Sequence, residues 1–428
     1  MGGAICHRMA VPTTTWQAPA VRRPSILVLG LATVTAALTG PGQTIGVSVF
    51  VDDLVSDLGL SREQVSGAYL VGTLAGAILL PWVGRMIDRR GVRLAQMAIG
   101  AAFALALVNM SFVQGVVWLA IGFAGIRFLG QGSLTLVSTM TVSLAFDRRR
   151  GTALGIFSTA TSALMALVPV ALALLIAGFG WRNTWLIAAG VVLVTVVPIG
   201  YFGLRSLPTG HLDSGSEPDA AVADRTDYDR SEAMRTRSFW ILASVTGSAG
   251  MLATALNFHQ IDLMGQAGIS QQAAAALFLP QVLGSTIAGL GFGYAADRFG
   301  TRYLPAVSMA LLIAALLLAA VITAGPVVIV YSVTLGAMGG AVRVVSATLL
   351  PAWFGTTHLG SIQGGMTFFN VGASALGPVV LSATEAGFGS YSPAVVVLAT
   401  IPAAALLFSL TVDRHRRPLG RVDLVSTS

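Results

Sequence analysis

The sequence predicts an all-α membrane protein, with twelve transmembrane helices arranged as two six-helix, pseudo-symmetric halves. Two observations support this prediction. Of the 428 residues, 55% are hydrophobic and only 10% are charged, whereas soluble domains carry about 25% charged residues. In addition, residues recur at a constant offset of 209 positions, so that Gly84 and Asp88 return as Gly293 and Asp297.

Twelve apolar runs approach the roughly 20 residues that a helix needs to cross a bilayer. In the first half they cover residues 25–50, 65–87, 94–113, 116–143, 151–177 and 183–203. In the second half they cover residues 239–261, 272–295, 303–323, 327–351, 360–385 and 391–412. Each run predicts one helix. Internal breaks such as Gly40-Pro41-Gly42 are tolerated where neighbouring helices satisfy the freed backbone groups.

The repeat also sets the expected domain boundaries. They are an N-terminal tail (1–24), a first bundle (25–204), a linker (205–238), a second bundle (239–412) and a C-terminal tail (413–428). The linker is rich in polar and acidic residues and shows no apolar period, which predicts a solvated loop. A tandem repeat in a membrane protein is typical of secondary transporters, whose substrate site lies between the two halves.

Arginine placement predicts the orientation in the membrane. All 25 basic residues are arginine. Only Arg62 and Arg182 fall in one set of loops, and Arg127 and Arg343 lie inside apolar runs; the others fall in the tails, the linker and the opposite loops. The positive-inside rule puts this second set in the cytoplasm. We therefore expect a multi-pass protein of the cytoplasmic (inner) membrane with both termini in the cytoplasm.

Several classes of function are disfavoured. The net charge of +7 is explained by membrane topology, so it does not indicate nucleic-acid binding. Cys6 is the only cysteine, which leaves no intrachain disulfide and no cysteine metal site. Without lysine there is no Walker-type nucleotide site, and no nucleophile–base–acid set is visible. We expect a monomer without enzyme activity, metal or cofactor, whose partners are the lipid bilayer and a small-molecule substrate.

Two loops repeat one motif. The first reads Gly84-Arg-Met-Ile-Asp-Arg-Arg-Gly-Val-Arg93, and the second reads Gly293-Tyr-Ala-Ala-Asp-Arg-Phe-Gly-Thr-Arg302. The pair resembles the cytoplasmic G-x-x-x-D-R-x-G-R-R loop of the major facilitator superfamily, which that family repeats after helix 8. The resemblance covers nearly the whole chain and implies the fold of that superfamily. It also implies a gating role for Gly84, Asp88, Arg89, Gly91, Arg93, Gly293, Asp297, Arg298, Gly300 and Arg302.

Two further segments are similar to one branch of the superfamily, the oxalate/formate antiporters and monocarboxylate transporters. They are Gly40-Pro-Gly-Gln-Thr-Ile-Gly-Val-Ser-Val-Phe50 and Phe146-Asp-Arg-Arg-Arg-Gly-Thr-Ala-Leu-Gly155. That branch often carries a cationic residue in helix 8 or 11 that pairs with a substrate carboxylate. This chain departs from the pattern, because residues 272–295 and 360–385 contain no arginine.

The two arginines inside apolar runs are the main candidates for binding substrate. A charge at the centre of a membrane helix costs about 2.5–3.5 kcal/mol even on insertion scales, so it usually faces a cavity or a partner. No acid lies at the same depth of either run, which favours an anionic substrate as partner. The alternatives are coupling or helix packing for Arg127, and snorkelling towards the cytoplasmic interface for Arg343.

Helices 1, 4, 7 and 10 line the cavity in the superfamily. The resemblance therefore adds Gln43, Asn257 and His259 to Arg127 and Arg343 as candidate substrate-binding residues. The alternative for each polar group is a hydrogen bond between helices. His259 could titrate near physiological pH, which would allow a coupling proton.

The sequence thus favours a secondary active transporter that moves a small organic anion, a mono- or dicarboxylate, by alternating access. It would work as an antiporter or symporter and without ATP. Two alternatives stay open. Proton-coupled efflux of drugs or amphipaths would need an acid that faces the cavity, and a non-transporting membrane sensor would normally add a folded soluble domain.

Overall fold

The computed structural model describes residues 26–146, 150–205, 228–355 and 358–411, and every element in these ranges is helical. The first half comprises α1 (Ile26–Ala37), η1 (Gly40–Gly42), α2 (Thr44–Val47), η2 (Ser48–Phe50), α3 (Val51–Leu58), α4 (Arg62–Ser111), α5 (Val116–Ile126), η3 (Arg127–Leu134), α6 (Thr135–Ala145), α7 (Arg150–Phe179), α8 (Trp181–Pro198) and η4 (Ile199–Gly203). The second half comprises α9 (Arg230–Arg235), α10 (Arg237–Phe258), α11 (Gln260–Gln266), α12 (Gln271–Ala276), α13 (Phe278–Phe299), α14 (Leu304–Ala320), α15 (Pro326–Phe354), α16 (Leu359–Phe388), α17 (Tyr391–Leu398) and α18 (Thr400–Leu410). The predicted tails and most of the linker lie outside the described residues.

Within the described residues, each of the twelve predicted runs forms one or more helices. Among the described residues, ten helices are long and apolar enough to cross a membrane, and α14, with 17 residues, is slightly shorter. The first span is a pair of helical segments, Ile26–Gly42 and Thr44–Leu58, bent by 47°. The second and third spans are joined through α4, whose backbone leaves the helical region at Gly91. The prediction of an all-α membrane protein is confirmed.

The 209-residue repeat is visible in the backbone as well as in the sequence. Three glycines with positive φ in the first half each have a counterpart with positive φ in the second: Gly59 (62°) and Gly268 (78°), Gly91 (76°) and Gly300 (81°), Gly180 (77°) and Gly389 (71°). L side chains rarely adopt this conformation, so glycine is required at both copies. Ser61 and Ser270 are also equivalent, since each caps the helix that follows by accepting a backbone N–H bond.

Glycine also lets helices of the second half approach closely. A Cβ atom at Gly336 would lie 1.9 Å from the carbonyl oxygen of Gln281, and one at Gly340 would lie 2.1 Å from that of Ser285. Both glycines belong to α15 and both carbonyls belong to α13. This contact of small residues fixes α13 against α15 and so positions the polar side chains that the two helices share.

The predicted linker is not irregular throughout. Residues Arg230–Arg235 form α9, although the sequence predicts a solvated loop there. The helix forms because Asp229 and Glu232 make a reciprocal capping box, in which the Asp229 carboxylate accepts the Glu232 N–H at 2.7 Å. That hydrogen bond lowers the pKa of Asp229 from its usual value. Ala233 packs into a cluster with Phe239 and so ties α9 to the second half.

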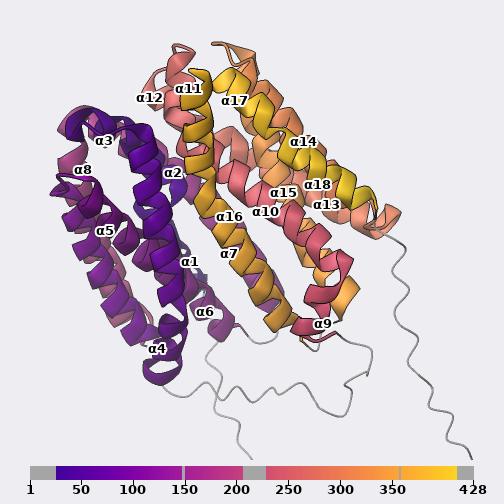
Figure 1. Cartoon of the computed structure of the whole chain (residues 1–428). Coiled ribbons are helices and arrows are strands. Elements are labelled where there is room, and N and C mark those ends of the chain that lie inside the picture. Colours follow the sequence, from indigo (N-terminus) through magenta and orange to yellow (C-terminus); the bar gives the residue numbers. More distant parts are fainter. Residues whose placement is uncertain (1–25, 147–149, 206–227, 356–357, 412–428) are drawn as a thin grey trace, which may run out of the picture.

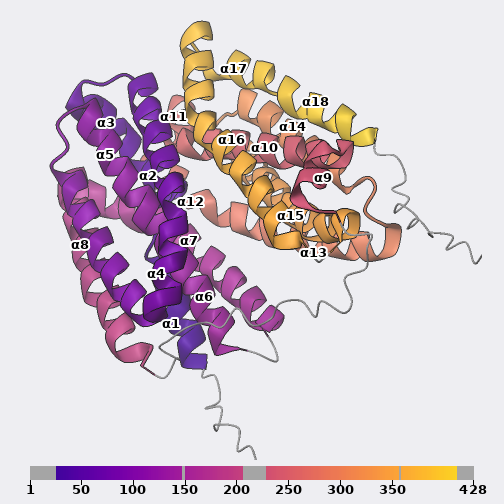
Figure 2. The ribbon, with the colours of Figure 1, turned by 60° about the horizontal axis from the view of Figure 1, so that its bottom comes forward.

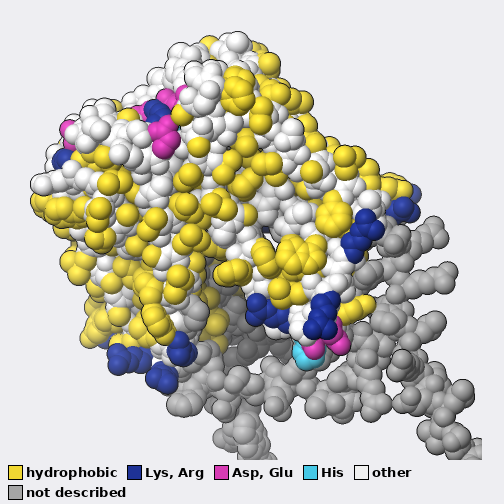
Figure 3. Space-filling model, viewed as in Figure 1, with side chains coloured by type: hydrophobic (Ala, Val, Ile, Leu, Met, Phe, Trp, Pro, Cys, Tyr) yellow, Lys and Arg dark blue, Asp and Glu magenta, His cyan; other side chains and the backbone are white. Residues whose placement is uncertain are grey.

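The two halves are bundles that meet at one end and diverge at the other (Figures 1 and 2). The meeting end carries α3, α11 and α12, and we call it the Arg62 end. The diverging end carries the bend at Gly91 and α9, and we call it the Arg89 end. In Figure 3 hydrophobic side chains cover the middle of the visible face, while arginine side chains gather at the Arg89 end of both bundles.

Candidate functional site

A central cavity of about 500 Å³ lies between the two halves. Helix α7 of the first half lines one side, and α10, α13 and α15 of the second half line the other. Its polar lining consists of Ser158, Thr159, Ser162, Asn257, Gln281, Ser285, Thr286 and Arg343. The lining includes one cation and no carboxylate. A cavity of this size between two bundles can hold a small polar molecule.

Arg343 is the charged group of this cavity. Its side chain extends from the middle of α15, and its Nη2 donates a hydrogen bond to Ser285 Oγ on α13. Among the described residues no carboxylate lies within ion-pair distance of the guanidinium. Arg343 also lines a neighbouring hollow with Asn370 and Gln363 of α16. The guanidinium is therefore exposed to the cavity with a neutral hydroxyl as its hydrogen-bond partner.

Arg127 has a different environment, although both arginines lie inside apolar runs of the sequence. Its side chain is buried, with Nε donating to Thr73 Oγ1 at 3.2 Å and Nη1 donating to Gly42 O at 3.4 Å and Thr44 Oγ1 at 3.3 Å. The guanidinium also lies 4.6 Å from the centre of the Tyr69 ring. Arg127 begins the π-helical segment η3. These contacts fix the broken first span against the fourth, and Arg127 does not line the central cavity.

The other three predicted substrate-binding residues also differ in whether they line the central cavity. Asn257 lines the central cavity, and its Oδ1 is buried without a hydrogen-bond partner among the described residues. Gln43 lines an adjoining hollow of the first half. His259 is buried and lines neither: its Nε2 lies 3.0 Å from Pro378 O, and its Nδ1 lies 3.2 Å from the Tyr391 hydroxyl.

The hydrogen bonds of His259 assign its tautomer. A carbonyl oxygen can only accept, so Nε2 carries the proton and donates it to Pro378. Nδ1 of the neutral ring then accepts from the Tyr391 hydroxyl. His259 thus joins α10, α16 and α17 at the Arg62 end, in a position without contact to the central cavity.

The Arg62 end is closed by polar and aromatic contacts between the halves. Arg62 Nη2 lies 2.8 Å from Asp52 Oδ1 of its own half and 2.7 Å from Asp262 Oδ1 of the other half. Gln271 Nε2 donates to the carbonyl of Val49 at 2.7 Å, again across the halves.

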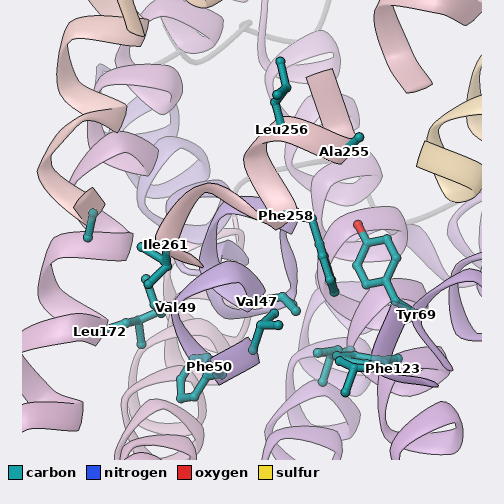
Figure 4. Close-up of a cluster of buried hydrophobic side chains, with 14 of the residues drawn as sticks. Val47, Val49, Phe50, Tyr69, Phe123, Leu172, Ala255, Leu256, Phe258 and Ile261 are labelled. Atoms are coloured by element: carbon teal, nitrogen blue, oxygen red, sulfur yellow. The ribbon is translucent and has the colours of Figure 1, made fainter. Parts of the chain in front are cut away.

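Behind these polar contacts the two halves share an apolar layer. The ring of Tyr69 in α4 packs against Phe258 of α10 with centroids 4.7 Å apart, as Figure 4 shows. Val47 and Phe50 of the broken first span belong to the same buried cluster. Contacts between the halves therefore close the Arg62 end, while the two bundles diverge towards the Arg89 end.

The predicted gating residues lie at the Arg89 end. Gly91 and Gly300 have the positive φ that the repeated motif requires. Arg93 lies over the ring of Tyr201, and Arg302 lies over the ring of Tyr303. The remaining members, Gly84, Asp88, Arg89, Gly293, Asp297 and Arg298, belong to the two helices that lead into these turns. Their gating role stays a prediction.

Helix α7 contributes site residues that the sequence did not predict. Ser158, Thr159 and Ser162 line the central cavity, and no prediction singled them out. Ser285, which accepts a hydrogen bond from Arg343, was not predicted either. The only signal was the spacing of hydroxyl residues at one helical face of an otherwise apolar run. Among the described residues, no group of three or more His, Cys, Asp or Glu side chains is placed to hold a metal ion.

Two bundles related by an internal repeat, with a polar cavity between them, define a membrane transporter of the alternating-access type. A family model described as the Major Facilitator Superfamily matches residues 27–285, more than half of the chain. The chain belongs to this superfamily.

Similar proteins agree with that assignment. "Monocarboxylate transporter 14" of Homo sapiens is 33% identical over 116 residues, which span 27% of this chain and 23% of the human protein. The match therefore covers less than a quarter of that relative's length. It shows partial similarity to a membrane transporter.

Two solved structures share the fold. One is a bacterial homologue of the human lysosomal transporter Spinster in an inward-facing, unoccupied conformation; it has a TM-score of 0.69 at 16% identity and covers 91% of this chain and 97% of its own. The other is a mutant of the nucleoside transporter NupG; it has a TM-score of 0.73 at 12% identity and covers 90% of this chain and 99% of its own. Both are transporters, and at these identities the similarity concerns the fold.

Proposed function

We propose that the protein is a secondary active transporter of a small organic anion, and that the anion binds to Arg343 in the central cavity. One observation carries the proposal: the guanidinium of Arg343 is exposed to the cavity and hydrogen-bonded to the neutral Ser285 rather than to a carboxylate. A cation at this depth costs about 2.5–3.5 kcal/mol without a partner. A bound anion supplies that partner.

The neighbours of Arg343 suit a carboxylate. Ser285 Oγ accepts from the guanidinium, which leaves its own O–H free to donate to a ligand. A planar guanidinium binds a carboxylate through two parallel N–H bonds. The partial similarity to a protein named as a monocarboxylate transporter agrees with this substrate class. Efflux of cationic amphipaths is less well supported, since the residues that line the cavity include no acid.

The proposed orientation puts the Arg89 end in the cytoplasm of a cell whose inner membrane holds the protein. The arginines at that end support it through the positive-inside rule. On this orientation the end closed by Arg62, Asp262 and the aromatic layer behind them faces the outside, and the bundles diverge towards the cytoplasm. Transport then requires the halves to separate at the Arg62 end and to close at the Arg89 end, where Asp88 and Asp297 are the proposed gating carboxylates.

A thermal-shift panel on the detergent-purified protein tests the anion site. A ligand that binds only the folded state at a hundredfold excess over its Kd adds about 2.7 kcal/mol to stability. We expect small carboxylates to raise the melting temperature of the wild type and to lose this effect in Arg343→Gln. Arg237→Gln, at the end of α10 away from the cavity, is the matched control and keeps the shift.

Two results of the thermal-shift panel would contradict the proposed anion site. If neutral solutes or amphipathic cations raise the melting temperature and carboxylates do not, the anion proposal is wrong. If carboxylates stabilise Arg343→Gln as strongly as the wild type, the anion binds elsewhere.

A further inference from the structure

A second polar hollow adjoins the central cavity on the side of the first half. It measures about 490 Å³ and is lined from α1, α6, α7 and Gln43. Ser158, Ser162 and Met165 of α7 line both spaces, so the two adjoin each other along this helix. None of the residues that line this second hollow is charged. The combined space thus has a cationic side on α15 and an uncharged hydroxyl-rich side on α7.

The hydroxyls of α7 lack the partner that such groups normally have in a membrane helix. Elsewhere in the chain a threonine or serine side chain donates to the carbonyl four residues earlier, as Thr141, Thr246 and Ser332 do. The hydroxyls of Ser158 and Ser162 make no hydrogen bond within the described part of the chain, and Thr161 Oγ1 is buried without a partner there. An unpaired hydroxyl in an apolar setting is unfavourable. Ser158 and Ser162, which line both spaces, are therefore available to a ligand, and the Thr161 hydroxyl is buried beside them.

Their spacing places them along one side of the helix. Positions 158, 161 and 162 follow the i, i+3, i+4 pattern of a single helical face, which Met165 continues without a hydroxyl. The three hydroxyl residues extend over about 6 Å of the helix axis at 1.5 Å per residue. A row of this length can meet several hydrogen-bonding groups of one ligand, which a two- or three-carbon acid does not offer.

We propose that this α7 face is a second substrate subsite, which binds the hydroxyl groups of a polyhydroxylated monocarboxylate whose carboxylate lies on Arg343. The proposal rests on the anion site proposed above. A second carboxylate would be buried against this face without a cation, which is costly. An alkyl chain would leave the hydroxyls unpaired, and sites with buried polar groups reject such analogues. The substrate would bridge the two halves and thereby favour closure of the Arg89 end.

The test compares gluconate with hexanoate, two six-carbon monocarboxylates that differ in their hydroxyl groups. Binding of each is measured by isothermal titration calorimetry to the full-length, detergent-purified protein. The variants are Ser158→Ala/Thr161→Val/Ser162→Ala, Arg343→Gln, and Thr334→Val as a control outside these cavities. We expect the triple variant to keep the fold, because the three hydroxyls that it removes have no partner among the described residues. An unchanged melting temperature without ligand checks this.

We expect the wild type to bind gluconate at least tenfold more tightly than hexanoate. The triple variant should lose that preference. Its affinity for gluconate should fall roughly tenfold or more, because up to three hydrogen bonds are lost, while its affinity for hexanoate should stay unchanged. Thr334→Val should behave as the wild type, and Arg343→Gln should lose both acids.

The outcomes separate the two proposals. If both acids bind through Arg343 and the triple variant keeps the wild-type affinity for gluconate, the subsite is wrong and the anion site stands. If hexanoate binds the wild type as tightly as gluconate, the subsite is again overturned. If neither acid binds the wild type, or Arg343→Gln has no effect, the anion site and the subsite fail together.

Discussion

Removing the charge of Arg62 should open the Arg62 end. The guanidinium is shared between Asp52 of its own half and Asp262 of the other, at 2.8 Å and 2.7 Å. The side chains of Arg62 and Asp262 are 21% and 17% exposed. Exposed ion pairs contribute about 0.2–1 kcal/mol, and breaking a fully buried pair costs about 3–5 kcal/mol. Because this pair is partly buried, we expect it to stabilise the closed state by about 1–2 kcal/mol.

The free energy of this ion pair sets how much the ratio of open to closed molecules changes when the pair is lost. Each 1.4 kcal/mol changes an equilibrium constant tenfold. Arg62→Gln removes the link between the halves and also leaves Asp52 and Asp262 without their shared cation. We expect it to raise the population that is open at the Arg62 end by about tenfold. Asp262→Asn removes the same link and should also open the Arg62 end, because the pair of Arg62 with Asp52 lies within one half and contributes equally in both states.

Pulsed electron paramagnetic resonance on nitroxide pairs measures the shift. Cys6→Ser removes the only native cysteine, and cysteines at the exposed positions Ser56 of α3 and Gln266 of α11 then report the separation of the halves. Arg182→Gln is the matched control. It breaks a 2.9 Å ion pair with Asp57 at the same end, but within one half.

The expected result is a second, longer distance in Arg62→Gln and the unchanged wild-type distance in Arg182→Gln. If Arg62→Gln keeps the wild-type distribution, the ion pair does not hold the halves together. An equal shift in the Arg182 control would show that any loss of charge at this end loosens the structure.

Two further predictions concern packing and the two intramembrane arginines. Gly336→Ala would place a Cβ atom 1.9 Å from the carbonyl oxygen of Gln281, so we expect it to destabilise the protein by about 1–3 kcal/mol or more; Gly339→Ala, with no atom within 4 Å of its Cβ, should leave the melting temperature nearly unchanged. Arg127→Met removes hydrogen bonds that hold the first span, so it should lower the melting temperature without ligand while anion stabilisation persists. Arg343→Gln should do the reverse, and the same thermal-shift assay distinguishes the two patterns.

The helices and the repeat could be predicted because their causes are local. A run of apolar residues near the thickness of a bilayer forms a helix whatever lies elsewhere. The repeated glycines at Gly91 and Gly300 correspond to a backbone conformation that few other residues adopt. The helix α9 in the linker also has a local cause, the capping box of Asp229 and Glu232, so the sequence could have predicted it.

The site could be predicted only in part, because its causes are long-range. Arg127 and Arg343 look alike as charges within apolar runs, yet one is enclosed by Gly42, Thr44 and Thr73 while the other is exposed to a cavity. That difference depends on which helices pack together.

The closed end depends on long-range packing in the same way. Arg62 and Asp262 belong to opposite halves, and no local pattern pairs them. The hydroxyls of α7 were missed for a related reason: a serine in an apolar run usually bonds its own helix, and only the structure shows that Ser158 and Ser162 do not.

Counterflow in proteoliposomes tests the central proposal most directly. Vesicles that hold the purified protein and an excess of unlabelled carboxylate, without nucleotide, are diluted into the same radiolabelled acid, with lactate, succinate and gluconate tried in turn. We predict transient accumulation of at least one labelled acid by the wild type and Arg237→Gln, and none by Arg343→Gln. Accumulation by Arg343→Gln equal to the wild type, or carriage of amphipathic cations and of none of the acids, would contradict an anion transporter built around Arg343.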